Sequence, residues 1–219
     1  PAAWQQTHWL GTPYAMTVQV DPNFALVWNK GLFSEAGLDA ERGPETLSEY
    51  EMHFRRLTRV DADGRVVQIG HRLWDVYGGA NTVYTWGWMF GGEFYDYENN
   101  VVTATNPHVV EALEFVRDYY ERYALTLGPN IAFPQGGEAM RLAVSANTRT
   151  WREQYPEISL GAGFEPYKEG SGSPNPSWIG GWAMGILRDA PSPDLAWQFL
   201  HYLTATTEGT DVFASASGW

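Results

Sequence analysis

Short apolar runs alternate with amphipathic stretches along this chain of 219 residues. Apolar and polar residues alternate from Tyr14 to Val20, and Phe24–Trp28 is an uninterrupted apolar run, so both segments are expected to be strands. The Asp21-Pro22-Asn23 triplet separates them as a turn. Further strands are predicted at 66–70, 158–163 and 182–187.

The remaining amphipathic stretches have the spacing of helices. Thr46 and Glu49 have the spacing of a capping box, and Leu47, Tyr50, Phe54 and Leu57 then recur on one helical face. The same reasoning predicts helices at 31–38, 44–59, 81–89, 106–123, 138–146 and 192–203. A connector rich in Gly, Ser and Pro spans 169–177. Alternating strands and helices indicate an α/β fold.

Charge and composition exclude several classes of function. With 26 acidic and 14 basic side chains the formal net charge is −12, which disfavours nucleic acid and anionic membrane surfaces as partners. The absence of cysteine excludes disulfides, a thiolate nucleophile and sulfur-ligated metals. No apolar run approaches the length of a membrane span, and the first residues lack the pattern of a signal peptide, so a mature chain or an internal piece is expected.

Familiar catalytic motifs are missing from the sequence. There is no phosphate-binding glycine loop, no nucleophile elbow and no paired histidine motif, so no catalytic residue, cofactor or metal is predicted. Asp61-Ala62-Asp63-Gly64 superficially resembles a calcium loop, but the glycine comes too early and Arg72 stands where a glutamate is needed, so a tight turn is expected. The unusual feature is an aromatic content of 11 Trp, 12 Tyr and 10 Phe, more than a core of this size requires.

An ordered series of segments resembles the family 1 extracellular solute-binding proteins, whose best-known members bind maltose and other oligosaccharides. Each segment alone is a weak match, and their common order between residues 11 and 213 makes the resemblance specific. The segments are Gly11–Tyr14, Leu26–Phe33, Ala36–Asp39, Pro44–Glu49 (with Leu47 in place of the usual Trp), Gly91–Asp96, Val110–Phe115, Phe133–Met140, Gly180–Ile186 and Ala196–Thr204.

The resemblance implies an α/β fold of the two-lobed periplasmic-binding-protein type II, with the ligand between the lobes. By this alignment residues 1–17 are part of lobe I and the first hinge crossing. Residues 18–170 are lobe II, and residues 171–219 are the second hinge crossing and the return to lobe I. The chain would therefore hold most of lobe II and only part of lobe I.

Aromatic residues near a cleft suit a sugar, because an aromatic plane covers the apolar face of the ring while polar groups bind its hydroxyls. In the predicted helix at 81–89, Trp86 is the first choice, followed by Tyr84 and Trp88, with a place in the core as the alternative for each.

The resemblance favours the returning strand as a second group of ligand contacts. There Trp182 would stack on the sugar, and the backbone at Gly180 and Gly181 would approach it closely. A position in the core of lobe I is the alternative for Trp182, and a surface ion pair is the alternative for Arg149. The other predicted ligand contacts are Trp178, Gln19, Asn147, Arg149 and Trp151.

The predicted function is that of an extracytoplasmic solute-binding component of an ABC importer. It would close around a mono- or oligosaccharide and deliver it to the permease subunits without any covalent step. A monomer is expected, periplasmic or extracellular, with a lipid anchor left open. One alternative is a glycoside hydrolase, with a carboxylate pair drawn from Asp75, Glu93, Asp96 and Glu98. The other is the same fold with a non-sugar ligand such as a polyamine, which would need Glu93, Asp75 and Glu138 to point inward.

Overall fold

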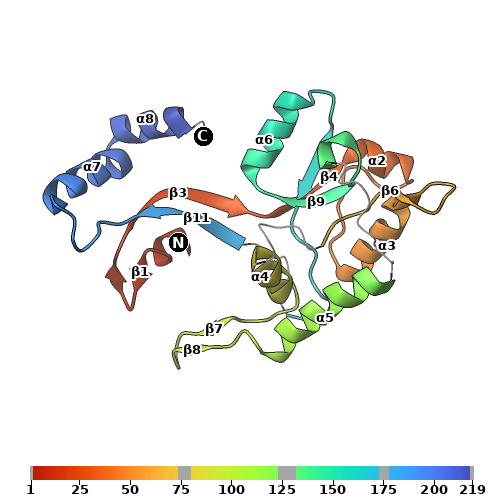
Figure 1. Cartoon of the computed structure of the whole chain (residues 1–219), viewed down its shortest axis with the longest axis horizontal. Coiled ribbons are helices and arrows are strands. Elements are labelled where there is room, and N and C mark those ends of the chain that lie inside the picture. The colour runs from red at the N-terminus through yellow and green to blue at the C-terminus, as the bar shows by residue number, and fades with distance from the viewer. Residues whose placement is uncertain (1, 74–79, 123–131, 173–177, 218–219) are drawn as a thin grey trace. The chain divides into compact units, whose positions relative to one another are not determined.

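A computed structural model describes residues 2–73, 80–122, 132–172 and 178–217 and divides the chain into two compact units (Figure 1). Unit 1 consists of residues 1–23 and 179–219, and unit 2 of residues 24–178. The chain therefore leaves and re-enters unit 1 once, through the segments around Asn23 and Trp178.

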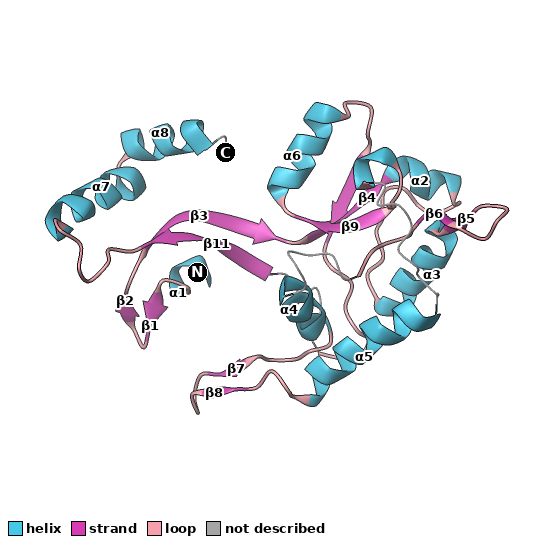
Figure 2. Cartoon of the chain, viewed as in Figure 1, coloured by secondary structure: helices cyan, strands magenta, loops and turns pink. Residues whose placement is uncertain are grey.

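The centre of unit 2 is a three-stranded sheet in the order β10-β4-β9 (Figure 2). Its strands are β4 (Ala25–Asn29), β9 (Met140–Ala143) and β10 (Leu160–Gly163). Both outer strands run antiparallel to β4. The apolar run of β4 is buried on both faces because helices cover both sides of this sheet, as a continuous apolar strand predicts.

Residues on β4 alternate between two hydrophobic clusters. Leu26 and Trp28 face the larger core, which is formed with side chains from α2 (Lys30–Glu35), α3 (Leu47–Leu57), α4 (Ala80–Met89) and α5 (Pro107–Arg122). Val27 faces the smaller cluster with Phe133 of the short 3₁₀ helix η2 (Phe133–Gln135), against which Trp151 of α6 (Ser145–Gln154) packs.

Local capping explains where the helices of unit 2 begin. The Asn29 side chain accepts hydrogen bonds from the backbone N–H groups of Gly31 and Leu32, which starts α2. Thr46 Oγ1 accepts from Glu49 N at 3.2 Å, whereas the Glu49 carboxylate accepts from Glu45 N at 2.9 Å, one residue further back than the capping box predicts. The predicted apolar face of this helix is confirmed, because all four of its residues are buried.

Two hairpins complete unit 2. The first pairs β5 (Arg59–Val60) with β6 (Val66–Gln68), and Asp61 Oδ1 accepts from Asp63 N and Arg65 N in its turn, as predicted. The second pairs β7 (Tyr95–Asp96) with β8 (Val101–Val102). Asp96 Oδ1 accepts from Glu98 N and Asn99 N in the second turn, so both acidic turns hold backbone geometry.

The predicted helix at 138–146 is wrong. Residues 140–143 form β9, and α6 begins only at Ser145. The residues of 138–146 include good helix formers, but Met140, Leu142 and Ala143 are buried in pairing with β4, and tertiary pairing overrides local propensity here.

Unit 1 contains a pair of strands and two helices at its C-terminal side. Strand β3 (Met16–Asn23) pairs with β11 (Trp178–Met184), α7 (Pro193–Ala205) packs beside β3, and α8 (Thr207–Ser217) packs on α7. The strand predicted at 182–187 thus begins four residues earlier and ends three residues earlier, and α8 was not predicted. The N-terminal segment adds α1 (Ala2–Gln5), β1 (His8–Trp9) and β2 (Thr12–Pro13). In the part of the chain that the structure describes, no helix is long and apolar enough to cross a membrane.

Candidate functional site

Three chain segments of unit 2 end at the same edge of its sheet. β9 and β10 both run opposite to β4, and the segment Ile69–Arg72 pairs in parallel with the residues that lead into β9. Ala139 N donates to Ile69 O at 2.9 Å, and Met140 N donates to Gly70 O at 2.7 Å. The carboxyl ends of these segments therefore lie at the edge where the chain enters β4. In α/β folds ligands bind outside such carboxyl ends, so this edge is the candidate site of unit 2.

Aromatic side chains cluster on the exposed side of α4. Tyr84 and Trp88 lie four residues apart and stack with ring centroids at 5.8 Å, and Phe94 meets the Tyr84 ring edge-on at 4.7 Å. Tyr84 is 41% exposed and Trp88 is half-buried. Lys168, a few residues beyond the end of β10, donates its backbone N–H to Met89 O at 3.0 Å, which places the end of α4 beside the carboxyl-end segment. The trio is therefore a pre-arranged aromatic surface near this edge.

Trp86 is withdrawn from the candidate ligand contacts. Its side chain is 0% exposed, and its Nε1 donates to Leu73 O at 3.1 Å. Its ring packs against Tyr50 and Phe115 in the larger core. A helix turns 100° per residue, so residue 86 faces away from residues 84 and 88, and the core alternative holds for it.

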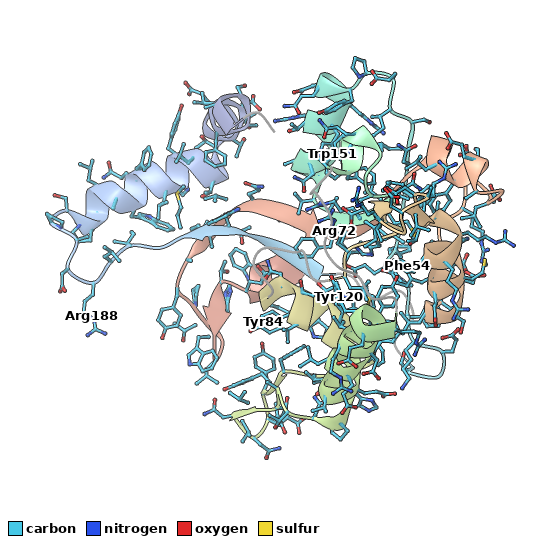
Figure 3. The ribbon with its side chains drawn as sticks, turned by 45° about the vertical axis from the view of Figure 1, so that its right-hand side comes forward. Phe54, Arg72, Tyr84, Tyr120, Trp151 and Arg188 are labelled. Carbon is cyan, nitrogen blue, oxygen red and sulfur yellow. The ribbon has the colours of Figure 1, made fainter. Side chains whose placement is uncertain are left out.

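The three candidates on α6 have local structural partners. Asn147 Oδ1 accepts from Val144 N at 3.3 Å at the start of the helix, and Arg149 Nε lies 3.8 Å from the Glu153 carboxylate on the surface. The Trp151 ring packs on Phe133 with centroids 4.7 Å apart (Figure 3). Trp151 is therefore assigned to packing and Arg149 to a surface ion pair, while Asn147 stays a candidate because its Nδ2 makes no hydrogen bond with any described residue.

The candidates in unit 1 lie together on β3 and β11. A Cβ atom on Gly181 would overlap the carbonyl oxygen of Gln19, so the two strands approach closely at this point. The Gln19 side chain is half-buried, and its Nε2 has no hydrogen-bond partner among the described residues. Trp182 is 69% exposed, and Gly180 is buried beside it. Trp178 begins β11, and its side chain lies outside the described part of the chain.

Two of the carboxylates on which the alternative functions depend, Asp96 and Glu138, have structural roles. Asp96 accepts hydrogen bonds from the Asn99 side chain and from backbone N–H groups of its turn, and these bonds lower the pKa of its carboxyl. Glu138 is buried and accepts from Arg72 N and Arg141 Nη1, so it is not available for a ligand amine. Glu93 and Glu98 are exposed, and Asp75 lies outside the described residues. No group of three His, Asp or Glu side chains suited to a metal ion occurs among the described residues.

The buried Tyr50–His71 pair and the buried Glu165 carboxyl lie in the larger core or beside it. Tyr50 and His71 share a hydrogen bond of 2.6 Å between Oη and Nδ1, and burial lowers the pKa of His71 to about 3, so its imidazole is neutral. Glu165, just beyond β10, is 2% exposed, and burial raises the pKa of its carboxyl to about 9. Neither group is exposed at the candidate edge, so neither is assigned a role in ligand contact.

Open hollows of about 750 and 440 Å³ lie on unit 1 around α7. Their walls are mostly apolar side chains such as Leu187, Leu195 and Phe199, all exposed. A sugar site needs several converging polar groups, so these hollows are not taken as the ligand site.

Two aromatic residues near the edge were missed by the sequence analysis. Phe94 follows the Gly91-Gly92 turn, and this turn folds it back onto α4, so its position after a helix-ending glycine pair was the available signal. Phe164 is 66% exposed directly after β10, and no sequence pattern distinguishes it from a core phenylalanine.

Chain topology and comparison with solved structures agree on the class of fold. The chain aligns with CpMnBP1 solved with mannobiose bound, at a TM-score of 0.81, 23% identity, and coverage of 97% of this chain and 55% of that one. It also aligns with the cyclic α-maltosyl-1,6-maltose binding protein of Arthrobacter globiformis, at a TM-score of 0.74, 22% identity, and coverage of 99% and 55%. The predicted periplasmic-binding-protein type II fold is confirmed.

The family follows from the sequence comparison. Residues 1–210 match the bacterial extracellular solute-binding protein family, and the chain belongs to it. A probable amino-acid ABC transporter periplasmic-binding protein of Sinorhizobium fredii is 26% identical over 187 residues, which are 82% of this chain and 41% of that protein. The chain thus spans about half the length of the relatives that it matches.

Proposed function

We propose that this chain is part of the solute-binding component of an ABC importer, and that it binds a mono- or oligosaccharide between two lobes and delivers it to the permease. The observation that carries the proposal is the stacked pair Tyr84 and Trp88, with Phe94 against it, at the carboxyl-end edge of unit 2. Rings fixed against one another lose little conformational freedom when a ligand binds, and they present the apolar surface that a sugar face requires.

Residues of unit 1 are further proposed ligand contacts. Trp182 offers an exposed indole, and Gln19 Nε2, which has no hydrogen-bond partner among the described residues, would bind a hydroxyl. We further propose that the protein acts by closure as a monomer, without catalysis, in the periplasm or at the cell surface with or without a lipid anchor. Binding-protein family membership, together with the role of the Asp96 carboxylate in its own turn, supports this over glycoside hydrolysis.

A second candidate is the same mechanism with an amino acid as the ligand. It is favoured by the name of the Sinorhizobium relative, a probable amino-acid transporter component. An amino acid needs partners for a carboxylate and an ammonium group, whereas a neutral sugar needs neither, so the two candidates differ in the charged groups that they require.

Calorimetric titration of the full-length protein with a panel of sugars and amino acids tests the proposal. Tyr84→Ala is expected to weaken sugar binding roughly tenfold, because truncation of an aromatic anchor costs more than about 1 kcal/mol. Tyr97→Ala, on the exposed β7–β8 turn, is the matched control and should leave the affinity unchanged. Binding of amino acids alone would select the second candidate, and release of shorter sugars from an oligosaccharide would refute both.

A further inference from the structure

Four cationic side chains of the described residues are half-buried, and one of them lacks a counterion. Three pair with carboxylates: Lys30 with Glu41, Arg141 with Glu138 and Lys168 with Glu111. The fourth is Arg72, whose guanidinium makes no hydrogen bond or ion pair with any described residue. Other arginines with no such partner, for example Arg188 on unit 1, are exposed to solvent (Figure 3).

The surroundings of Arg72 leave its charge uncompensated. The carboxylate of Glu138, which is 1% exposed, lies beside the backbone of Arg72. One of its oxygens accepts from the backbone N–H of Arg72 at 2.8 Å, and the other accepts from Arg141 Nη1 at 3.0 Å. Glu138 is therefore paired with the Arg141 guanidinium and with the Arg72 backbone, and it forms no ion pair with the Arg72 guanidinium.

The position of Arg72 in the fold is that of a ligand contact. Arg72 ends the segment that pairs with the residues leading into β9, and this segment points toward the carboxyl-end edge of the sheet. A half-buried cation has lost part of its hydration, so an uncompensated one at such an edge favours an anion there. The planar guanidinium offers two parallel N–H donors, the geometry that a carboxylate accepts best.

We propose that Arg72 binds a carboxylate of the transported solute. This rests on the proposed function, that the carboxyl-end edge of unit 2 binds a solute, and it narrows the solute to one that carries a carboxylate. A sugar acid and an amino acid share that group, and the aromatic trio favours the sugar acid because it can cover the apolar face of a ring.

Titration calorimetry on the full-length protein with matched ligands tests this. Galacturonate is compared with galactose, glucuronate with glucose, and glutamate serves as the amino acid. The acid of a pair is expected to bind at least tenfold more tightly than its neutral partner. Arg72→Gln should weaken binding of the acid by about 10-fold to 100-fold and leave the neutral sugar unchanged, as expected for a hydrogen bond to a charged group. Arg72→Lys should retain part of the preference.

Arg65→Gln is the control, because it removes the same charge from the exposed β5–β6 turn. Equal affinity for acid and neutral sugar in the wild type, or equal weakening of both by Arg72→Gln, would overturn the assignment while leaving sugar binding intact. Binding of none of these solutes would count against the proposed function itself.

An internal role for Arg72 is tested separately. Asp75, outside the described residues, is the nearest carboxylate along the chain. If Asp75→Asn and Arg72→Gln lower stability equally and non-additively, with ligand affinities unchanged, Arg72 belongs to an internal ion pair and the proposal is wrong.

Discussion

The carboxyl group of Glu165 should make the stability of unit 2 depend on pH. Its side chain is 2% exposed, and Oε1 has no hydrogen-bond partner among the described residues. Burial alone raises the pKa of this carboxyl from its ordinary value of 4.5 to about 9. Glu165 is therefore protonated in the folded protein at neutral pH and ionised in the unfolded chain.

The direction of the effect follows from proton linkage. Between pH 4.5 and about 9 the folded state holds a proton that the unfolded state has released, so the free energy of unfolding falls as pH rises. Each pH unit in this window corresponds to about 1.4 kcal/mol. Between pH 5 and pH 8 the loss from this one group is thus about 4 kcal/mol, an upper bound if water reaches the carboxylate after it ionises.

Glu165→Gln isolates this contribution because glutamine has the same shape and does not titrate. The buried amide changes stability by a constant amount, so the test is the pH dependence of the difference between the two proteins. Urea unfolding at pH 5, 6, 7 and 8, followed by the fluorescence of the buried Trp28 and Trp86, measures this difference. The variant should gain about 4 kcal/mol relative to the wild type across the series.

Glu157→Gln is the control, because Glu157 is exposed and the substitution removes the same charge. It should leave the stability profile parallel to that of the wild type. If the Glu165→Gln profile is also parallel, Glu165 ionises freely in the folded protein and the argument from burial fails.

Three further predictions concern packing and capping in unit 2. Gly161→Ala should lower stability by about 1–3 kcal/mol in urea unfolding, because the added methyl overlaps the Trp28 indole, whereas Gly163→Ala, with its nearest approach to Trp28 at 3.4 Å, should cost less than about 1 kcal/mol. Asn29→Ala should cost about 1 kcal/mol through loss of the cap of α2, and Asn29→Asp should recover most of it; an equal loss in both would refute the capping role. Trp86→Ala should cost about 3–5 kcal/mol while the ligand affinity of the folded fraction, measured by calorimetry, stays unchanged, and a selective loss of affinity would return Trp86 to the site.

The parts of the fold that could be predicted are those determined by local chemistry. The apolar run of β4 and the Thr46 cap follow from neighbouring residues, and the structure confirms both. The helix predicted at 138–146 failed because β9 depends on a partner more than 100 residues earlier, where Leu26 pairs with Leu142. The residues next to β9 in the sequence do not show that it pairs with β4.

Site residues were harder to predict than the fold. Helical spacing shows which side chains share a face of a helix, but it does not show which face packs against the core. Tyr84 and Trp88 share one face of α4, and Trp86 lies on another. The structure shows which face is buried: Tyr50 of α3 and Phe115 of α5 pack against Trp86. Only the packing of these distant helices shows that the exposed pair is available to a ligand.

Arg72 could not be identified as a ligand contact from the sequence. Along the sequence it is an ordinary arginine, and a surface ion pair is the usual fate of such a residue. The fold shows what distinguishes it: Lys30, Arg141 and Lys168 are half-buried like Arg72, and each of the three has a carboxylate partner. The chain has 26 acidic residues, yet no described carboxylate forms an ion pair with this guanidinium. Where internal carboxylates are abundant and one half-buried cation has none, a carboxylate supplied by the solute is the simplest completion of the site.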